Sequence, residues 1–371
     1  MREQMALYYR RLALDGCCYW YDYLLMLVLI PCGYIYGVIG QIRVWMYRRG
    51  ILPTYRAHVP VICVGNLVVG GTGKTPVVSW VLDFLHQHGY RTVVISRGYA
   101  SSPATGEGVR ARKVEVERAG GHAHAAREYG DEPVLLALRH PQASVVVAPK
   151  RADGVRYIKD HHDVDVILLD DAFQHLALER NLDLVLLDAR KPLGNGRVMP
   201  AGLMRERRSA LQRADMLLLT RYSSDTDIPE VHPKSAVHKP TVRVAYRLAP
   251  YAIDLNGTRV SLDDLSRFSL GAFAGIADPE DFFASLHRYG IHPLSALPLA
   301  DHAPYTAERV AHILTRFEGV EALITTEKDA VKLDPELFPL PCYYVPLEIE
   351  PVEEERLKQA LLTSLTVQNI H

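Results

Sequence analysis

The sequence predicts an α/β protein in which helices cover a mostly parallel sheet, with a second, smaller α/β domain and an N-terminal membrane-associated helix. Three observations predict it. Short, continuous apolar runs alternate with helix-length stretches between residues 61 and 220, a glycine-rich turn follows the first of these runs, and residues 23–42 carry no charge. Continuous apolar strands that alternate with helices indicate a parallel sheet buried on both faces.

Composition limits the class of protein. A chain of 371 residues suggests about two domains, and 48% hydrophobic with 23% charged residues indicates a globular protein. The net charge of -1 gives no reason to expect nucleic-acid binding, because such proteins usually carry a basic surplus. The five cysteines form no C-x-x-C pair or zinc pattern, which indicates a reduced, cytoplasmic-side protein without a structural metal.

Changes in composition predict the domain limits. We expect a membrane-associated segment at 1–42, a nucleotide-binding domain at 43–221, and a smaller C-terminal α/β domain at 241–371. The stretch between these domains, 222–240, is rich in Ser, Asp, Pro and His and is expected to be a linker.

The N-terminal apolar stretch, 23–42, has about the length needed to span a bilayer. Pro31 interrupts it, and arginines flank both of its ends. A simple span would favour positive charge on one side, so we expect a kinked helix that lies in one leaflet with its arginines at the headgroups. A helix buried in the globular domain is the alternative.

The first strand, Val61–Val64, leads into a turn that ends in Gly73-Lys74-Thr75 and opens a helix. This is the layout of a P-loop, in which backbone N–H groups and the helix N-terminus surround a phosphate, Lys74 adds a charge and Thr75 offers a hydroxyl to Mg²⁺. Val68 stands where the strict motif has glycine, so the turn departs from the general pattern. The predicted nucleotide-binding residues are Gly70, Gly71, Thr72, Gly73, Lys74 and Thr75.

Further apolar runs predict the remaining strands of both domains. In the first domain they are Thr92–Ile95, Ser144–Val147, Val166–Leu169, Leu184–Leu187 and Met216–Leu219, and in the second Val242–Tyr246, Leu270–Ala274, Ala322–Thr325 and Tyr343–Val345. The expected helices are Val77–His88, Pro133–Arg139, Pro279–Tyr289 and Thr306–Phe317. Ligands of such sheets bind beyond the carboxyl ends of the strands, so the residues that follow each run are the candidates for function.

Two aspartates, Asp170 and Asp171, follow the run Val166–Leu169. An apolar strand that ends in aspartate is the Walker B layout, whose carboxylate holds Mg²⁺ directly or through water. Asp188 ends another apolar run and is a rival, but Gln174 and His175 nearby favour the Asp170–Asp171 pair.

Two acidic residues, Asp131 and Glu132, precede an apolar helix. Asp131 can be read as an N-cap or as a base beside a metal-binding Glu132, and the residues alone leave both readings open. The pair Asp301–His302 precedes a helix in the second domain and by itself is more typical of a helix cap than of chemistry.

Two loops carry basic residues that could contact a substrate or phosphate, and both could also be ordinary turns. Arg97 and Tyr99 lie in the Ser96–Tyr99 turn that follows a strand, and Arg205 lies in an apolar and basic loop near residue 200.

Taken together, these motifs resemble tetraacyldisaccharide 4′-kinase, the lipid A 4′-kinase of Gram-negative bacteria. The runs that carry the resemblance cover residues 61 to about 333 and stand in the family's order: Gly65-Asn66 with Gly70–Pro76, Ser96–Tyr99, Gly130–Pro133, Asp170-Asp171 with Phe173–His175, Pro200–Gly202 with Arg205-Glu206, Gly275-Ile276, Asp301-His302 and Thr326–Lys332. Ala172, Ala274 and Leu203-Met204 depart from the usual family residues and affect the shape of loops rather than an ionisable group.

The resemblance implies an ATP- and Mg²⁺-dependent kinase that phosphorylates the 4′-hydroxyl of a tetraacylated glucosamine disaccharide 1-phosphate at the cytoplasmic face of the bacterial inner membrane, as a peripheral or monotopic protein. It makes Lys74 the β/γ-phosphate contact and Asp131 the base, with His302 as its partner across the domain cleft. Its implied metal ligands are Thr75, Glu132, Asp170 and Asp171. The candidate substrate contacts are Arg97, Tyr99, Gln174, His175 and Arg205.

Two other functions remain as alternatives. A membrane-associated P-loop switch or assembly factor would hydrolyse nucleotide without an acceptor, and a GTPase of this kind needs a guanine-reading motif that Thr326–Asp329 matches only with the wrong spacing. A non-enzymatic anchor would have no need of Lys74, Thr75 and the aspartate pair.

Overall fold

The computed structural model describes residues 8–9, 11–14, 16–71, 73–98, 111–116, 122–224 and 239–366. The chain forms two compact units, and neither is a continuous stretch of sequence. The first unit combines residues 1–95, 150–245 and 350–371, and the second combines residues 96–149 and 246–349.

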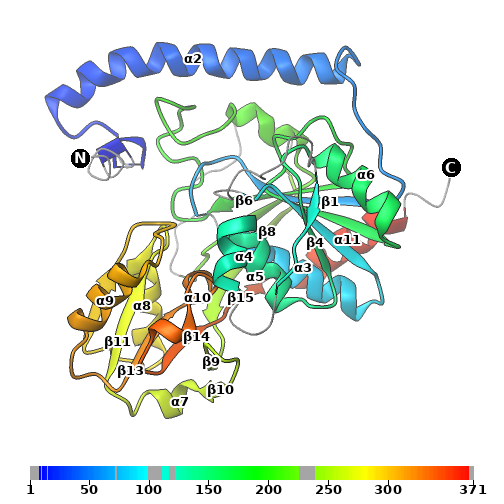
Figure 1. The fold of residues 1–371 in the computed structure, drawn as a ribbon. Coiled ribbons are helices and arrows are strands. Elements are labelled where there is room, and N and C mark those ends of the chain that lie inside the picture. Colours follow the sequence, from blue (N-terminus) through cyan, green and yellow to red (C-terminus); the bar gives the residue numbers. More distant parts are fainter. Residues whose placement is uncertain are drawn as a thin grey trace. The chain divides into compact units, whose positions relative to one another are not determined.

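A parallel sheet forms the centre of the first unit (Figure 1). Its strands run in the order β8-β7-β6-β1-β5-β2, each paired in parallel with the next. In the nine-stranded sheet β15 follows β8 at one end, and β4 and then β3 follow β2 at the other. Every residue of β1, β2, β5 and β7 is buried, which explains why their sequences are continuous apolar runs. The strands are β1 (Val61–Asn66), β2 (Thr92–Ser96), β5 (Val166–Asp170), β6 (Leu182–Asp188), β7 (Met216–Thr220), β8 (Thr241–Leu248) and β15 (Leu347–Pro351).

Helices of the first unit follow from apolar residues at helical spacing. In α3, Val77, Val78, Val81 and Leu85 are buried and lie on one face. Gly73 precedes α3 in the left-handed conformation, with a φ of 71°, which glycine adopts without strain. The helices are α2 (Trp20–Arg48), α3 (Lys74–Gln87), α6 (Arg151–His161), the 3₁₀ helix η1 (Arg208–Arg213) and α11 (Glu354–Thr366).

The second unit contains a six-stranded sheet in the order β10-β9-β14-β13-β11-β12. Strands β11, β12, β13 and β14 pair in parallel, and β9 and β10 add an antiparallel edge. The elements after residue 246 are β9 (Tyr251–Asp254), β10 (Arg259–Ser261), α7 (Leu262–Leu265), β11 (Leu270–Ala274), α8 (Pro279–Arg288), β12 (Ser295–Pro298), α9 (Ala307–Arg316), β13 (Ala322–Thr326), α10 (Glu327–Ala330), η2 (Pro335–Leu337) and β14 (Cys342–Val345).

The remaining elements of the second unit come from the middle of the sequence. They are β3 (Arg112–Lys113), α4 (His122–Tyr129), α5 (Asp131–Arg139) and β4 (Ser144–Val147), and β3 pairs antiparallel with β4. Helix α5 contacts α10. The sequence predicted continuous domains at 43–221 and 241–371, whereas residues 96–149 group with the C-terminal sheet and β8 pairs with β7 of the first unit. Most of the predicted linker, 225–238, lies outside the described residues.

Helix α2 is continuous from Trp20 through Pro31 to Arg48. It is the one helix in the described part of the chain that is long and apolar enough to cross a membrane. An 18-residue stretch of the helix has a mean hydropathy of 1.9, and 17% of that stretch is buried. Most of its large apolar side chains are exposed, including Leu27 at 73% and Ile35 at 60%. The helix is therefore not the core helix that formed the alternative prediction.

Candidate functional site

The glycine-rich turn joins β1 to α3, as predicted. Gly70 has a φ of 124° and Gly73 a φ of 71°, both in the region that favours glycine. Lys74 and Thr75 form the first turn of α3, where backbone N–H groups and the positive end of the helix can bind an anion. Thr72, which the sequence places among the nucleotide-binding residues, lies outside the described residues.

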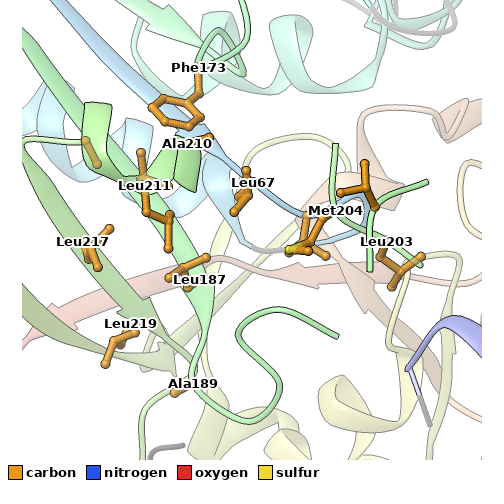
Figure 2. Close-up of a cluster of buried hydrophobic side chains, with 14 of the residues drawn as sticks. Leu67, Phe173, Leu187, Ala189, Leu203, Met204, Ala210, Leu211, Leu217 and Leu219 are labelled. Atoms are coloured by element: carbon orange, nitrogen blue, oxygen red, sulfur yellow. The ribbon is translucent and has the colours of Figure 1, made fainter. Parts of the chain in front are cut away.

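Val68 stands where the strict P-loop motif has glycine, and this part of the turn pairs with another segment. Val68 forms an antiparallel bridge with Met204, and the Val69 N–H donates to the Leu203 carbonyl at 2.8 Å. Val68 is 7% exposed and belongs to a buried cluster with Leu67, Leu203 and Met204, the last three of which are labelled in Figure 2. The turn is therefore supported by the loop near residue 200, and Val68 contributes an apolar side chain to that support.

Asp171 lies beside Lys74, which connects the predicted Walker B strand to the turn. The Lys74 Nζ is 3.6 Å from the Asp171 carboxylate, and Arg205 contacts the same carboxylate at 3.0 Å. Burial would raise the pKa of Asp171, but the charges of Lys74 and Arg205 lower it below the ordinary value. Asp171 has a φ of 50°, and its N–H donates to the Val64 carbonyl at 2.9 Å, so the conformation is fixed by β1.

Asp170 precedes this turn and is 7% exposed. Its carbonyl accepts a hydrogen bond of 2.8 Å from Arg151, a residue at the start of α6 that is 1% exposed. No motif in the sequence predicts this contact. The rival Asp188 contacts Arg190 and Arg221, at 3.1 and 3.0 Å. Contact with the P-loop lysine thus favours the Asp170–Asp171 pair.

Asp131 and His302 form a direct contact within the second unit. The His302 Nδ1 lies 3.1 Å from the Asp131 Oδ2, and the side chains are 27% and 12% exposed for His302 and Asp131, respectively. The expectation that this pair bridges two domains is wrong, because residues 96–149 and 246–349 belong to one unit.

Neither residue of this pair is a helix cap. Gly130, with a φ of 98°, is the N-cap of α5, and Asp131 is the first helical residue. Thr306 caps α9, and its hydroxyl accepts from the Arg309 N–H. His302 has a φ of 57°, a conformation that costs about 1–3 kcal/mol for a non-glycine residue and tends to occur at functional sites.

Two lysines surround the Asp131–His302 pair. Lys328 lies 3.1 Å from Glu132 and 3.2 Å from the His302 Nε2, and Lys332 lies 3.8 Å from Asp131. When Lys328 donates to the Nε2 atom, the Nδ1 carries the proton that is donated to Asp131. Both lysines belong to the Thr326–Lys332 motif that carries part of the family resemblance, but the residues alone indicate no role for either.

The electrostatics of the pair favour an ionised Asp131. Burial would raise the pKa of Asp131, but the hydrogen bond from His302 and the charge of Lys332 lower it below its ordinary value. The same hydrogen bond raises the pKa of His302, while burial and the charge of Lys328 act in the opposite direction. The arrangement can accept a proton at Asp131 and compensate charge through the imidazole.

The predicted substrate contacts divide between the two units. Gln174 donates to the Asn66 carbonyl at 2.8 Å, and Arg205 lies 3.4 Å from the Gln174 Oε1, so both lie beside the turn with Asp171. His175 follows in the same segment of the first unit and is half-buried. Arg97 belongs to the second unit and is exposed after β2, and Tyr99 lies outside the described residues.

Helix α2 contacts the loop of residues 198–207. A Cβ at Gly33 would be 2.8 Å from the Val198 carbonyl, and one at Gly37 would be 2.9 Å from the Arg207 Nε, so the glycines allow close approach. Arg207 donates to Gln41 at 3.0 Å and lies 4.6 Å from the centre of the Tyr34 ring. A pocket of about 210 Å³ lies at this contact, and its basic lining residues are Arg48, Arg205, Arg207 and Arg213.

Known proteins resemble this chain over nearly its whole length. The family model of tetraacyldisaccharide-1-P 4′-kinase, LpxK, matches residues 25–366. The tetraacyldisaccharide 4′-kinase of Syntrophotalea carbinolica is 44% identical over 362 residues, which are 96% of this chain and 97% of the relative. The corresponding protein of Geobacter sulfurreducens is 39% identical over 95% of this chain and 98% of its own length.

A solved structure supports the same conclusion. A crystal structure of LpxK from Aquifex aeolicus in complex with ATP has a TM-score of 0.74 and 30% sequence identity, and the match covers 92% of this chain and 99% of the other. Sequence similarity and fold similarity therefore point to the same family. The chain therefore belongs to the tetraacyldisaccharide 4′-kinase family.

Proposed function

We propose that the protein transfers the γ-phosphoryl group of ATP to the 4′-hydroxyl of a tetraacylated glucosamine disaccharide 1-phosphate, which yields the bis-phosphorylated lipid IVA. Family membership supports the reaction and its substrate. The observation that carries the proposal is the 3.1 Å contact between Asp131 and His302, because a sugar hydroxyl needs a positioned base as charge develops on its oxygen.

In this mechanism Asp131 accepts the proton of the 4′-hydroxyl as the sugar oxygen bonds to the γ-phosphorus. The bond from that phosphorus to the bridging oxygen breaks, and ADP leaves with the electron pair. His302 holds Asp131 by its hydrogen bond. Lys74 contacts the β- and γ-phosphates and compensates their charge, which is the main contribution of protein groups to phosphoryl transfer.

The donor set at the turn fits Mg²⁺. Asp170 and Asp171 supply carboxylates, Thr75 supplies a hydroxyl next to Lys74, and Lys74 contacts Asp171 at 3.6 Å. Carboxylate, hydroxyl and phosphate oxygens are the ligands that Mg²⁺ prefers. Mg²⁺ bound there would neutralise charge on the nucleotide phosphates.

We also propose that α2 holds the protein on the cytoplasmic face of the inner membrane, in one leaflet. Its exposed apolar side chains would enter the acyl region, and the arginines near its C-terminal end would contact anionic headgroups. This placement suits an acceptor that carries four acyl chains and a phosphate.

The direct test is an incubation of the purified protein with ATP labelled in the γ-phosphate, Mg²⁺ and the disaccharide 1-phosphate in mixed micelles. A labelled bis-phosphorylated lipid is the expected product, and Lys74→Met should abolish it. ATP hydrolysis that proceeds equally without acceptor, with no phosphorylated lipid, would instead support a nucleotide-driven switch.

A further inference from the structure

Lys332 is a buried cation that lies outside the P-loop and is not itself a member of the Asp131–His302 pair. Its side chain is 8% exposed, and its Nζ lies 2.9 Å from Asp329 and 5.1 Å from the centre of the Tyr305 ring. Lysine is rarely buried unless it is paired, so this position has a specific electrostatic role.

Asp329 fixes the position of this lysine. Asp329 is fully buried and accepts from the Gly275 N–H at 2.8 Å and from the Thr326 hydroxyl at 2.7 Å. The Thr326 hydroxyl also accepts from the Asp329 N–H at 3.1 Å and caps α10. The end of β11 and the start of α10 therefore hold the carboxylate to which Lys332 is bound.

From this fixed site Lys332 reaches Asp131. Its Nζ is 3.8 Å from the Asp131 Oδ2, which is the oxygen that also contacts the His302 Nδ1 at 3.1 Å. Two groups from different elements therefore hold one oxygen of the carboxylate. Such an arrangement restricts the rotation of the Asp131 carboxylate.

We propose that Lys332 is a positioning residue for phosphoryl transfer: anchored by Asp329, it holds Asp131 in the orientation that receives the proton of the acceptor hydroxyl. The proposal rests on the proposed function. Lys332 acts through Asp131 and does not itself touch the substrate. Misplacement of a catalytic group by about 1 Å can cost about 10²-fold in rate, so the loss of this contact should reduce turnover.

A purely structural role for Lys332, as the counter-ion of Asp329, makes a different prediction. In that case Lys332→Met would lower stability, and any loss of activity would be independent of Asp131. A double-mutant cycle separates the two roles, because residues that act through one another give non-additive effects.

The experiment measures single-turnover rates, the KM for ATP and the thermal unfolding of full-length wild type, Lys332→Met, Lys332→Arg, Asp131→Asn and the double variant Asp131→Asn/Lys332→Met. Lys358→Met is the control, since Lys358 pairs with Glu354 and Glu355 on the surface of α11. Phosphorylation of the lipid acceptor by wild type is established first, so that a failure of the proposed function is recognised separately.

We expect Lys332→Met to lower turnover by about tenfold or more with the KM for ATP within about twofold of wild type. It should have no further effect in the Asp131→Asn background. Lys332→Arg keeps the cation beside Asp329 and should unfold at nearly the wild-type temperature while turnover still falls, because the larger head cannot reproduce the contact. Wild-type turnover in both variants, or an equal loss with and without Asp131, would overturn the proposal.

Discussion

Asp131 begins α5, where the positive end of a helix makes a carboxylate a weaker base. The structure adds His302 and Lys332, which lower the pKa of Asp131 further. A base of this kind is effective only when it is well oriented, because its affinity for a proton in the resting protein is small. The neighbours of Asp131 must therefore hold its carboxylate in the orientation that receives the proton.

Replacing either member of the pair should reduce catalysis without loss of nucleotide binding. Asp131→Asn and His302→Ala should each lower kcat by roughly 10²-fold or more, which is the usual scale of acid–base catalysis. The KM for ATP should stay near the wild-type value. His287→Ala, at an exposed histidine of the same unit, is the matched control and should retain activity. Turnover near wild type in either variant would remove that residue from the mechanism.

The same pair makes stability depend on pH. The folded-state pKa of His302 is raised, so its stabilising contact is complete below the unfolded pKa of about 6.5 and is lost as pH rises through the higher folded value. The difference in melting temperature between wild type and His302→Ala should be largest near pH 6 and shrink toward pH 9. Lys328, Glu132 and Asp301 also face His302. A difference that grows with pH would contradict this sign.

Among the secondary-structure elements, helix α2 combines two surfaces with different requirements. One contains glycines that approach the loop of residues 198–207, and the other consists of exposed apolar side chains. Each surface can be tested separately.

The glycine surface predicts a contrast between two substitutions. Gly33→Ala places a Cβ at 2.8 Å from the Val198 carbonyl, whereas Gly40→Ala meets no atom within 4 Å. Gly33→Ala should loosen α2 and speed limited proteolysis near the helix. Gly40→Ala should leave proteolysis unchanged or slow it slightly, because alanine favours a helix by up to about 1 kcal/mol over glycine. Equal behaviour of the two variants would show that Gly33 does not hold the helix.

The apolar surface predicts membrane binding. The double variant Leu27→Glu/Ile35→Glu removes two exposed apolar side chains, each of which contributes about 1.5–3 kcal/mol when buried in an apolar phase. Binding to vesicles of anionic phospholipid should fall by about a hundredfold or more, with the melting temperature unchanged. Leu294→Glu, at a residue 70% exposed in the second unit, is the control and should bind normally. Retained binding by the double variant would exclude this surface as the anchor.

Elements were easier to predict than their partners. Ser144–Val147 and Leu270–Ala274 agree with the structure residue for residue, because continuous apolar runs favour buried strands. The place of α5 could not be predicted, since its contact with α10 joins residues almost two hundred positions apart. The contact of Lys332 with Asp131 also joins distant parts of the sequence, so it could not be predicted either. From the sequence alone, a lysine in a short helical motif is expected to be a surface residue.

Across the whole molecule, the chain passes between the two units at residues 95/96, 149/150, 245/246 and 349/350. Four crossings distinguish this protein from two domains joined by one linker, which is the organisation that the composition predicted. Each unit nevertheless has its own buried cysteine, Cys63 in β1 and Cys342 in β14.

These two thiols report the opening of each unit separately. Burial raises the pKa of both thiols, so labelling by a maleimide requires unfolding, while the exposed Cys18 and Cys32 should react at once. The variant Cys17→Ser/Cys18→Ser/Cys32→Ser leaves only the two buried thiols.

A bound nucleotide should protect the first unit more than the second. A ligand that binds only the folded state stabilises that state by mass action, and the P-loop with Lys74 belongs to the first unit. A non-hydrolysable ATP analogue should therefore slow labelling of Cys63 more than that of Cys342, as measured by mass spectrometry of the peptides. Lys74→Met should remove this protection, whereas equal slowing of both thiols would mean that the four crossings make the units unfold as one.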